Sequence, residues 1–218
     1  SRKAYDNNYT EGFYFGVEVS SVSVWELNMI KSGAKGNLTY GIREGGPAGG
    51  DLAIAIDEEY ITAHQIDYVV GGTHWAMYTE NKAKEIVKDY HRQNMFLAQH
   101  NLVDIIAHPW WYLGPCEDGW YEDFSIIPKQ MHEEFARSCI QNKKLIEINL
   151  SAMLLNTKNN EKFKQQYLDY LVFLKECGAQ FSIGSDCHNE FYTIDFSKAS
   201  NILENAGFTA DDFYSPVK

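Results

Sequence analysis

Short apolar runs alternate with longer amphipathic segments along most of this chain. The apolar runs are rich in β-branched residues, which favours strands, and the amphipathic segments repeat apolar residues every three or four positions, which favours helices. We expect strands at 13–20, 66–71, 102–109, 144–149 and 180–184, and helices at 57–65, 80–100, 128–142, 159–177 and 197–206. Strands that alternate with helices predict an α/β fold, with a parallel sheet covered by helices.

Two segments do not follow this alternation. Residues 1–12 are polar and are expected to be irregular. Residues 21–50 contain seven glycines and Pro47, which predicts a long loop with a short hairpin around 37–43. These glycines do not form a strand–GxGxxG–helix unit, so the segment does not indicate dinucleotide binding.

Charged and imidazole side chains lie inside or just after the predicted strands. Glu18 lies within the first strand, His74 follows the second and His108 follows the third. Asp186 and His188 follow the last strand and are two residues apart, so in an extended backbone they point the same way. The carboxyl ends of parallel strands share one face of an α/β barrel, where active sites are built. We therefore expect these five side chains to converge.

The combination of carboxylates and imidazoles suits Zn, Mn or Fe ions, and a bridging carboxylate suits two neighbouring ions. Such ions lower the pKa of a bound water and neutralise charge on a substrate oxygen. Hydrolysis of a phosphate ester needs this kind of positioning and charge stabilisation. The pattern thus suits two neighbouring divalent metals and a small phosphorylated substrate. The simpler interpretation is an exposed Glu at a strand edge, a capping Asp and chance histidines in loops.

Other chemistries remain open on the same residues. Glu18 and Glu147 would suit a glycosidase, which uses two carboxylates, but the strand-end histidines would then have no role. Ser185 lies beside Asp186 and near His188, without the GxSxG turn of a nucleophilic serine. Hydrolysis of a phosphodiester, and metal binding without catalysis, are the remaining alternatives.

Composition limits the partners. With 30 acidic and 19 basic residues the formal net charge is −11, which argues against non-specific nucleic-acid binding. A small phosphorylated substrate is still compatible, because bound metal ions would dominate the local field. No apolar run approaches the about 18 residues of a membrane span. The four cysteines are scattered without a CxxC pair, which favours free thiols and a cytoplasmic location.

Five segments carry the candidate residues: Gly16-Val17-Glu18-Val19, Gly71-Gly72-Thr73-His74, Ile106-Ala107-His108-Pro109, Ile146-Glu147-Ile148-Asn149 and Gly184-Ser185-Asp186-Cys187-His188. In this order they resemble successive motifs of the PHP domain, a family named after polymerases and histidinol phosphatases. Trp75 and the helix–strand spacing most resemble the histidinol-phosphatase branch. The resemblance spans about residues 13–208, nearly the whole chain.

The resemblance implies a single domain over 1–218 with a distorted, TIM-like (β/α)7 barrel and up to three metals at its C-terminal face. It implies that Glu18 bridges two metals and that His74 and His108 complete one site. Asp186 would bind the other bridged ion and His188 would serve the third. Glu18, Asp186 and His188 would carry the catalysis, as hydrolysis of a small phosphomonoester such as histidinol phosphate.

Substrate contacts are harder to assign. Arg43 in the long loop is a candidate for contacting a phosphate, with Trp75 and Asn149 as further candidates, and Glu147 is expected near the site without being a certain ligand. The aromatic run 110–112 either lines the mouth of a pocket or covers the end of the core.

The chain departs from the family at its start. The family opens with a His-x-His element on its first strand, whereas no histidine precedes His64 here. The pattern also predicts five strands where the barrel has seven. We therefore expect that about 60 residues, the size of two strand–helix units, are absent from the chain as given. The alternative is a degenerate member that keeps only the site of Glu18, His74 and His108 and one weaker ion.

Overall fold

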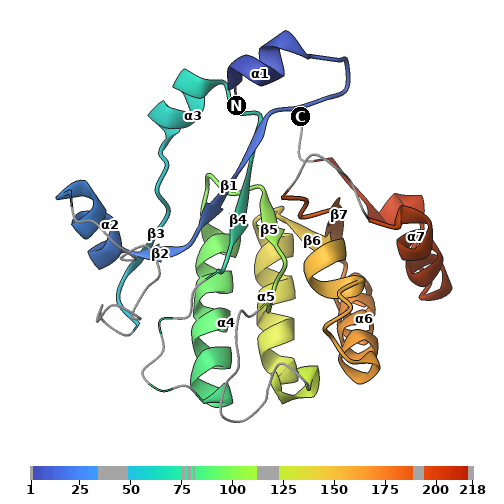
Figure 1. The fold of residues 1–218 in the computed structure, drawn as a ribbon. Coiled ribbons are helices and arrows are strands. Elements are labelled where there is room, and N and C mark those ends of the chain that lie inside the picture. The colour runs from blue at the N-terminus through green and yellow to red at the C-terminus, as the bar shows by residue number, and fades with distance from the viewer. Residues whose placement is uncertain are drawn as a thin grey trace.

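The computed structural model describes residues 2–33, 49–74, 77, 80, 82–111, 123–188 and 194–215. Its centre is a sheet of five strands in the order β1-β4-β5-β6-β7, in which all neighbours pair in parallel (Figure 1). The strands are β1 (Gly16–Ser20), β4 (Tyr68–Gly72), β5 (Ile105–Ala107), β6 (Leu145–Asn149) and β7 (Gln180–Gly184). The five predicted strands are thus confirmed, with the first and the third shorter than expected.

A long helix follows each of the strands β4, β5, β6 and β7 of this sheet. The helices are α4 (Ala83–Gln99), α5 (Lys129–Gln141), α6 (Glu161–Glu176) and α7 (Phe196–Asn205). Figure 1 shows α4, α5 and α6 side by side, and α5 packs against both neighbours. Because each crossover returns the chain to the same end of the sheet, every strand points its carboxyl end toward the same edge. The predicted α/β class is confirmed, and the closed seven-stranded barrel stays a prediction.

Local capping signals in the sequence define several helix ends. The carboxylate of Asp57 accepts a hydrogen bond from the backbone N–H of Tyr60 and caps α3 (Glu58–His64), as expected of an N-cap aspartate. Helix α6 ends just before Gly178, whose φ of +92° is in the left-handed region that favours glycine.

The structure corrects two expectations about the N-terminal part of the chain. Residues 1–12 contain the short helix α1 (Arg2–Asn7), and the predicted loop 21–50 contains α2 (Val24–Lys31). Helix α1 is held from outside, because the guanidinium of Arg2 donates to the carbonyl of Gln65 at 2.7 Å. Helix α2 had a signal in the sequence: the Ser23 hydroxyl accepts from the backbone N–H of Glu26, the start of a capping box.

Two short strands and three short helical turns complete the described fold. Strand β2 (Val22–Ser23) pairs antiparallel with β3 (Leu52–Ala53), beside the parallel sheet. Single helical turns occur at η3 (Phe124–Ile126), η4 (Leu150–Leu154) and η5 (Ala210–Asp212), and η4 is π-helical. The hairpin expected around 37–43 lies outside the described residues.

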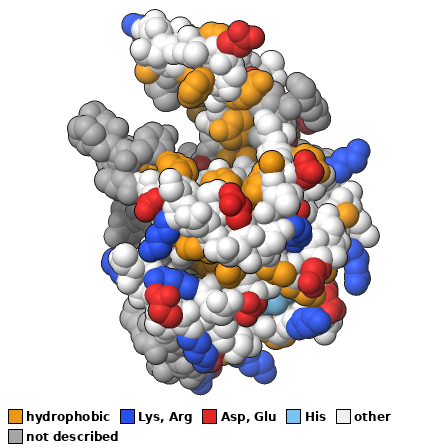
Figure 2. Space-filling model, turned by 90° about the vertical axis from the view of Figure 1, so that its right-hand side faces the viewer, with side chains coloured by type: hydrophobic (Ala, Val, Ile, Leu, Met, Phe, Trp, Pro, Cys, Tyr) orange, Lys and Arg blue, Asp and Glu red, His pale blue; other side chains and the backbone are white. Residues whose placement is uncertain are grey.

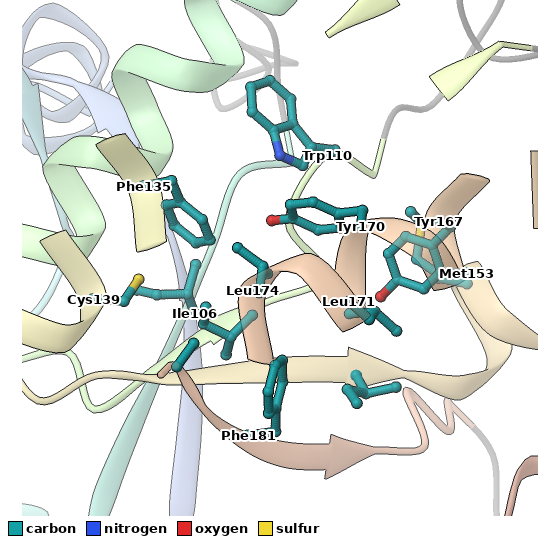
Figure 3. Close-up of a cluster of buried hydrophobic side chains, with 14 of the residues drawn as sticks. Ile106, Trp110, Phe135, Cys139, Met153, Tyr167, Tyr170, Leu171, Leu174 and Phe181 are labelled. Atoms are coloured by element: carbon teal, nitrogen blue, oxygen red, sulfur yellow. The ribbon is translucent and has the colours of Figure 1, made fainter. Parts of the chain in front are cut away.

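The core lies between the sheet and helices α4, α5 and α6. Figure 3 shows strand side chains such as Ile106 and Phe181 facing Phe135 of α5 and Leu174 of α6. All four are fully buried. The apolar stripes predicted for these two helices are therefore the faces that pack on the sheet, and burying them supplies the main driving force for this arrangement.

Figure 2 shows acidic and basic side chains interspersed on the face beside β7 and α7, with no large patch of one sign. Within the described residues, none of the helices combines the length and the apolar character needed to cross a bilayer.

Candidate metal centre

Three predicted ligands meet at the carboxyl edge of the sheet. Glu18 comes from β1, His74 follows β4 and His108 directly follows β5. Nε2 of His74 lies 2.9 Å from Oε1 of Glu18, and Nε2 of His108 lies 3.4 Å from the same oxygen. The three ligand atoms of this group lie within 4.8 Å of one another. Residues 90 positions apart in sequence are thus brought to one point by the parallel order β1-β4-β5.

Gly71 and Gly72 at the end of β4 leave space for neighbouring side chains on opposite faces of the sheet. A Cβ on Gly72 would lie 2.6 Å from Cε1 of His74 and 3.2 Å from Cε1 of His108. A Cβ on Gly71 would instead lie 2.9 Å from a methyl group of Val103 in the core. Because side chains alternate along a strand, Gly72 leaves space for the two imidazoles and Gly71 leaves space for core packing.

Ser20 and Trp111 also belong to this centre: Ser20 was not predicted, and Trp111 comes from the aromatic run for which the sequence left a pocket-lining role open. The hydroxyl of Ser20 forms a hydrogen bond of 3.0 Å with Nδ1 of His74, which fixes the ring orientation and leaves Nε2 facing Glu18. The indole of Trp111 packs against both imidazoles, with ring centroids 5.9 Å from His74 and 5.0 Å from His108. Ser20 lies two residues after Glu18 on the same strand, so period-two alternation was a signal that could have found it.

Helix α4 holds the strand ends below the centre through buried polar side chains. Gln93 accepts a hydrogen bond of 2.6 Å from the hydroxyl of Ser21, just after β1. Asn94 accepts one of 3.0 Å from the hydroxyl of Thr73, just after β4. Both side chains are fully buried. Hydrogen bonds between buried side chains are strong in their low-dielectric surroundings, so these two bonds help to fix the segments that carry Ser20 and His74.

The three ligands polarise one another. Hydrogen bonds from His108 and His74 hold the pKa of Glu18 far below its ordinary value of 4.5, against the opposing effect of burial. Burial lowers the pKa of His108, but its hydrogen bond with Glu18 and the nearby carboxylates of Glu147 and Asp186 outweigh burial and raise that pKa. Glu18 is therefore ionised, and both imidazoles stabilise its carboxylate through hydrogen bonds.

This arrangement fits a divalent cation. One carboxylate oxygen and two imidazole nitrogens are a ligand set that Zn²⁺, Mn²⁺ and Fe²⁺ accept. Both imidazole nitrogens face the carboxylate of Glu18, and a bound cation would supply the positive charge that balances this carboxylate. Trp111 covers the rings on one side, while the Glu18 side chain is 43% exposed. The residues present therefore suit a metal that is open to solvent on one side.

Asp186 and His188 lie after β7 and contact each other. Nε2 of His188 lies 2.8 Å from Oδ1 of Asp186, so the two side chains face the same way as predicted. The reason differs from the prediction, because Asp186 has φ +50° and β7 ends at Gly184. A left-handed turn, not an extended backbone, brings them together. Among the described residues they are not part of the group formed by Glu18 and the two strand-end histidines.

Of the predicted substrate contacts, Asn149 is buried, whereas Arg43 and Trp75 lie outside the described residues. Asn149 is 1% exposed: its Nδ2 donates to Oε2 of Glu147 at 3.1 Å, and its Oδ1 accepts from the backbone of Ala152 at 2.8 Å. Its amide is thus engaged inside the protein below the centre.

The aromatic run after β5 takes both roles that the sequence left open. Trp110 is fully buried in the core, stacked on His91 and edge-on to His132. Trp111 lies at the centre instead, and Tyr112 lies outside the described residues. Two adjacent tryptophans therefore have different functions, one in packing and one in lining the candidate centre.

The two glycines of β4 provide a matched test of this geometry. Gly72→Ala should weaken Zn²⁺ or Mn²⁺ binding about tenfold or more, because the new methyl group displaces His74 and His108. Gly71→Ala should instead lower stability by about 1–3 kcal/mol, the usual effect of overpacking a core, and leave metal affinity close to that of the parent. Isothermal titration and thermal unfolding measure the two effects. Equal metal affinities for the two variants would contradict the position assigned to the imidazoles.

The fold and this centre define a parallel α/β protein with a candidate metal site at the carboxyl ends of its strands. No protein-family model matches the chain, and no curated protein matches it. Solved structures do resemble it. Histidinol phosphate phosphatase from Lactococcus lactis subsp. lactis, crystallised with zinc, L-histidinol and phosphate, superposes with a TM-score of 0.52 and 21% sequence identity.

That superposition covers 71% of this chain and 64% of the phosphatase chain, so the chain spans less than two thirds of the phosphatase. At this identity the likeness shows a shared fold. A chain of an archaeal ribonuclease P, determined by electron cryo-microscopy with mature tRNA, gives a TM-score of 0.49 at 15% identity over 94% of this chain and 68% of the other. That score is too low to support an argument about function.

Proposed function

We propose that this protein is a metal-dependent phosphoesterase of the PHP type that hydrolyses a small phosphomonoester. One observation carries the proposal: Glu18, His74 and His108 converge within 4.8 Å at the carboxyl edge of a parallel sheet. Support also comes from the fold shared with a phosphatase that was crystallised with zinc and phosphate. The sequence pattern predicts the same three residues as ligands.

In this proposal Glu18, His74 and His108 hold one divalent cation. When bound, such a cation supplies a Lewis acid that makes water a better nucleophile and neutralises charge on phosphoryl oxygens. Glu18 supplies the negative charge of the site, and Ser20 keeps the ring of His74 in place through Nδ1. Trp111 excludes water from one side of the imidazoles.

Asp186 and His188 are proposed to hold a second cation. They offer an oxygen and a nitrogen 2.8 Å apart, a spacing like the 2.9 Å between Glu18 and His74. The imidazole of His188 is 87% exposed while the carboxylate of Asp186 is 18% exposed. Asp186 is therefore anchored, and His188 is free to turn toward an incoming ligand or substrate.

A small substrate fits the chemistry of the described surroundings. Trp111 offers a flat apolar wall beside the candidate metal site. The formal net charge of −11 is unfavourable for large polyanions. Histidinol phosphate is the first phosphomonoester to test, because the Lactococcus lactis phosphatase was crystallised with L-histidinol and phosphate.

The proposal is tested by metal content and by hydrolysis with the full chain. Elemental mass spectrometry after addition of Zn²⁺ or Mn²⁺ is expected to give two or more ions per chain. Metal-dependent release of phosphate from small monoesters, with little hydrolysis of diesters, is the expected activity. Preferential diester hydrolysis would make the protein a phosphodiesterase. Stable metal binding without turnover would make it a binding module, and no metal binding would refute the proposed centre.

A further inference from the structure

We infer that Glu147 is a positioning residue that aims the imidazole of His108 at the metal centre by holding the backbone of His108. The inference rests on the proposed metal site and assigns a role to a buried carboxylate outside its ligand group. Oε2 of Glu147 accepts a hydrogen bond of 2.7 Å from the backbone N–H of His108. Glu147 is in the middle of β6, so this bond joins two neighbouring strands where β5 ends.

The backbone at His108 requires such support. Its φ is +25°, a value that residues other than glycine rarely adopt, and Trp110 two residues later has φ +70°. Residues in such regions persist only when their surroundings hold them there. Pro109 between them has no backbone N–H to contribute. Besides the bond to Glu147, the carbonyl of His108 accepts from the backbone N–H of Trp111 at 3.0 Å, so the turn is held at both of its polar groups.

Glu147 is itself held from two sides. Nδ2 of Asn149 donates to the same Oε2 at 3.1 Å, and Oδ1 of Asn149 caps the turn that follows β6. On the other side, a Cβ on Gly184 of β7 would overlap the carboxyl group of Glu147. The strand β7 thus has a glycine where the carboxylate needs space. Residues of β6 and β7 thus position Oε2 of Glu147 against the backbone N–H of His108, which follows β5.

The environment argues for orientation rather than metal ligation by Glu147. Its Oε2 already accepts two N–H donors, and its other oxygen faces the backbone at Gly184. Among the described residues, the group of converging ligand atoms contains Glu18 and the two strand-end histidines, without Glu147. An ionisable group held in a buried position is costly. The hydrogen bond to His108 offers a functional reason for burying Glu147, because residues that orient metal ligands by hydrogen bonds influence metal affinity.

Three single variants of the full chain test the inference. Glu147→Ala removes the acceptor, and Gly184→Ala displaces it without removing it. Both should weaken Zn²⁺ or Mn²⁺ binding about 10- to 100-fold in isothermal titrations. Glu147→Gln keeps an amide oxygen that accepts the same bond, so its affinity should stay within about threefold of the parent, a change smaller than the about 10-fold lower limit expected for the other two variants. Thermal unfolding of the metal-free proteins separates loss of affinity from loss of folding.

The double variant adds a stricter condition. If Gly184→Ala acts through the carboxylate, it should have no further effect on affinity in the Glu147→Ala background, because effects on one shared interaction are not additive. Additive effects would overturn the proposed link. Parent-like affinity of Glu147→Ala would overturn the positioning role. Equal weakening by Glu147→Ala and Glu147→Gln would also overturn it, since Glu147 would then be a ligand.

A second readout keeps this inference separate from the proposed function. Amide hydrogen exchange at His108, followed by NMR in the metal-free proteins, should become faster in Glu147→Ala and stay unchanged in Glu147→Gln. If the parent binds no metal, the proposed function fails while the exchange rates still decide whether Glu147 holds the backbone of His108. Unchanged exchange in Glu147→Ala would refute the inference whatever the metal result.

Discussion

Glu18→Gln is expected to remove metal binding at the centre and to lower phosphomonoester hydrolysis by about 1,000-fold, the equivalent of the several kcal/mol that a metal contributes to the transition state. Gln keeps the size and shape of the side chain but removes the negative charge that both imidazoles face. The measurements are metal titration and the rate of phosphate release from a monoester at saturating Mn²⁺.

The metal-free protein gives the same substitution a second signature. The pKa of Glu18 is lowered from 4.5, so its ionised form stabilises the fold above that pH and the effect is lost as the pH falls through the folded-state pKa. The pKa of His108 is raised from 6.5, so its protonated form stabilises the fold below that pH and the effect is lost as the pH rises through the folded-state pKa. The parent should therefore exceed Glu18→Gln in stability most clearly between pH 4.5 and 6.5.

Glu134→Gln is the matched control for Glu18→Gln. Oε2 of Glu134 lies 2.8 Å from Nε2 of His91, so this substitution also breaks a Glu–His pair, but on the outer helices α4 and α5. It should leave metal affinity and hydrolysis unchanged. If Glu18→Gln retained the metal affinity of the parent, or if both variants lost activity equally, the assignment of Glu18 as a ligand would be wrong.

Trp110→Ala is expected to destabilise the protein by about 3–5 kcal/mol, the usual cost of truncating a fully buried Trp. For a chain of this size the unfolding temperature should fall by roughly 10 °C. Trp110 is one of the buried side chains drawn in Figure 3 and is fully buried. It stacks on His91 and makes an edge contact with His132, whose pKa burial lowers to about 4. The cavity would open beneath the turn that carries His108, so metal affinity should fall as well.

Trp111→Ala separates the two adjacent tryptophans. Trp111 is partly exposed and contacts His74 and His108 at the centre. Its removal should cost less than about 1.5 kcal/mol of stability, the scale of a surface aromatic contact, and should mainly affect substrate affinity. Differential scanning calorimetry compares the variants directly. A larger fall in unfolding temperature for Trp111→Ala than for Trp110→Ala would reverse the roles assigned here.

The ligand residues could be selected from the sequence because their signal is local. His74 and His108 follow apolar runs directly, and Glu18 is an acid inside one, an unfavourable position unless it has a partner. Parallel strands separated by helices must align their carboxyl ends, so proximity follows from the pattern of elements alone. Side-chain alternation in an extended backbone predicted that Asp186 and His188 face the same way; they do contact each other, but through a left-handed turn at Asp186.

Other features had weaker signals or none in the sequence. Helix α1 depends on the bond from Arg2 to Gln65, 63 residues away, so its own composition did not predict it. Helix α2 was missed although Ser23 and Glu26 have the spacing of a capping box. The surrounding glycines outweighed that signal.

The sequence by itself determined the α/β class, the order of the elements and which side chains lie near the strand ends, because these follow from periodicity along the chain. Only the tertiary structure decided which contacts those side chains make. It placed Trp110 in the core and Trp111 at the centre, and it joined Glu147 to a backbone 39 residues earlier. Hydrogen bonds and space between strands depend on register and on the neighbouring strand, and no single segment encodes them.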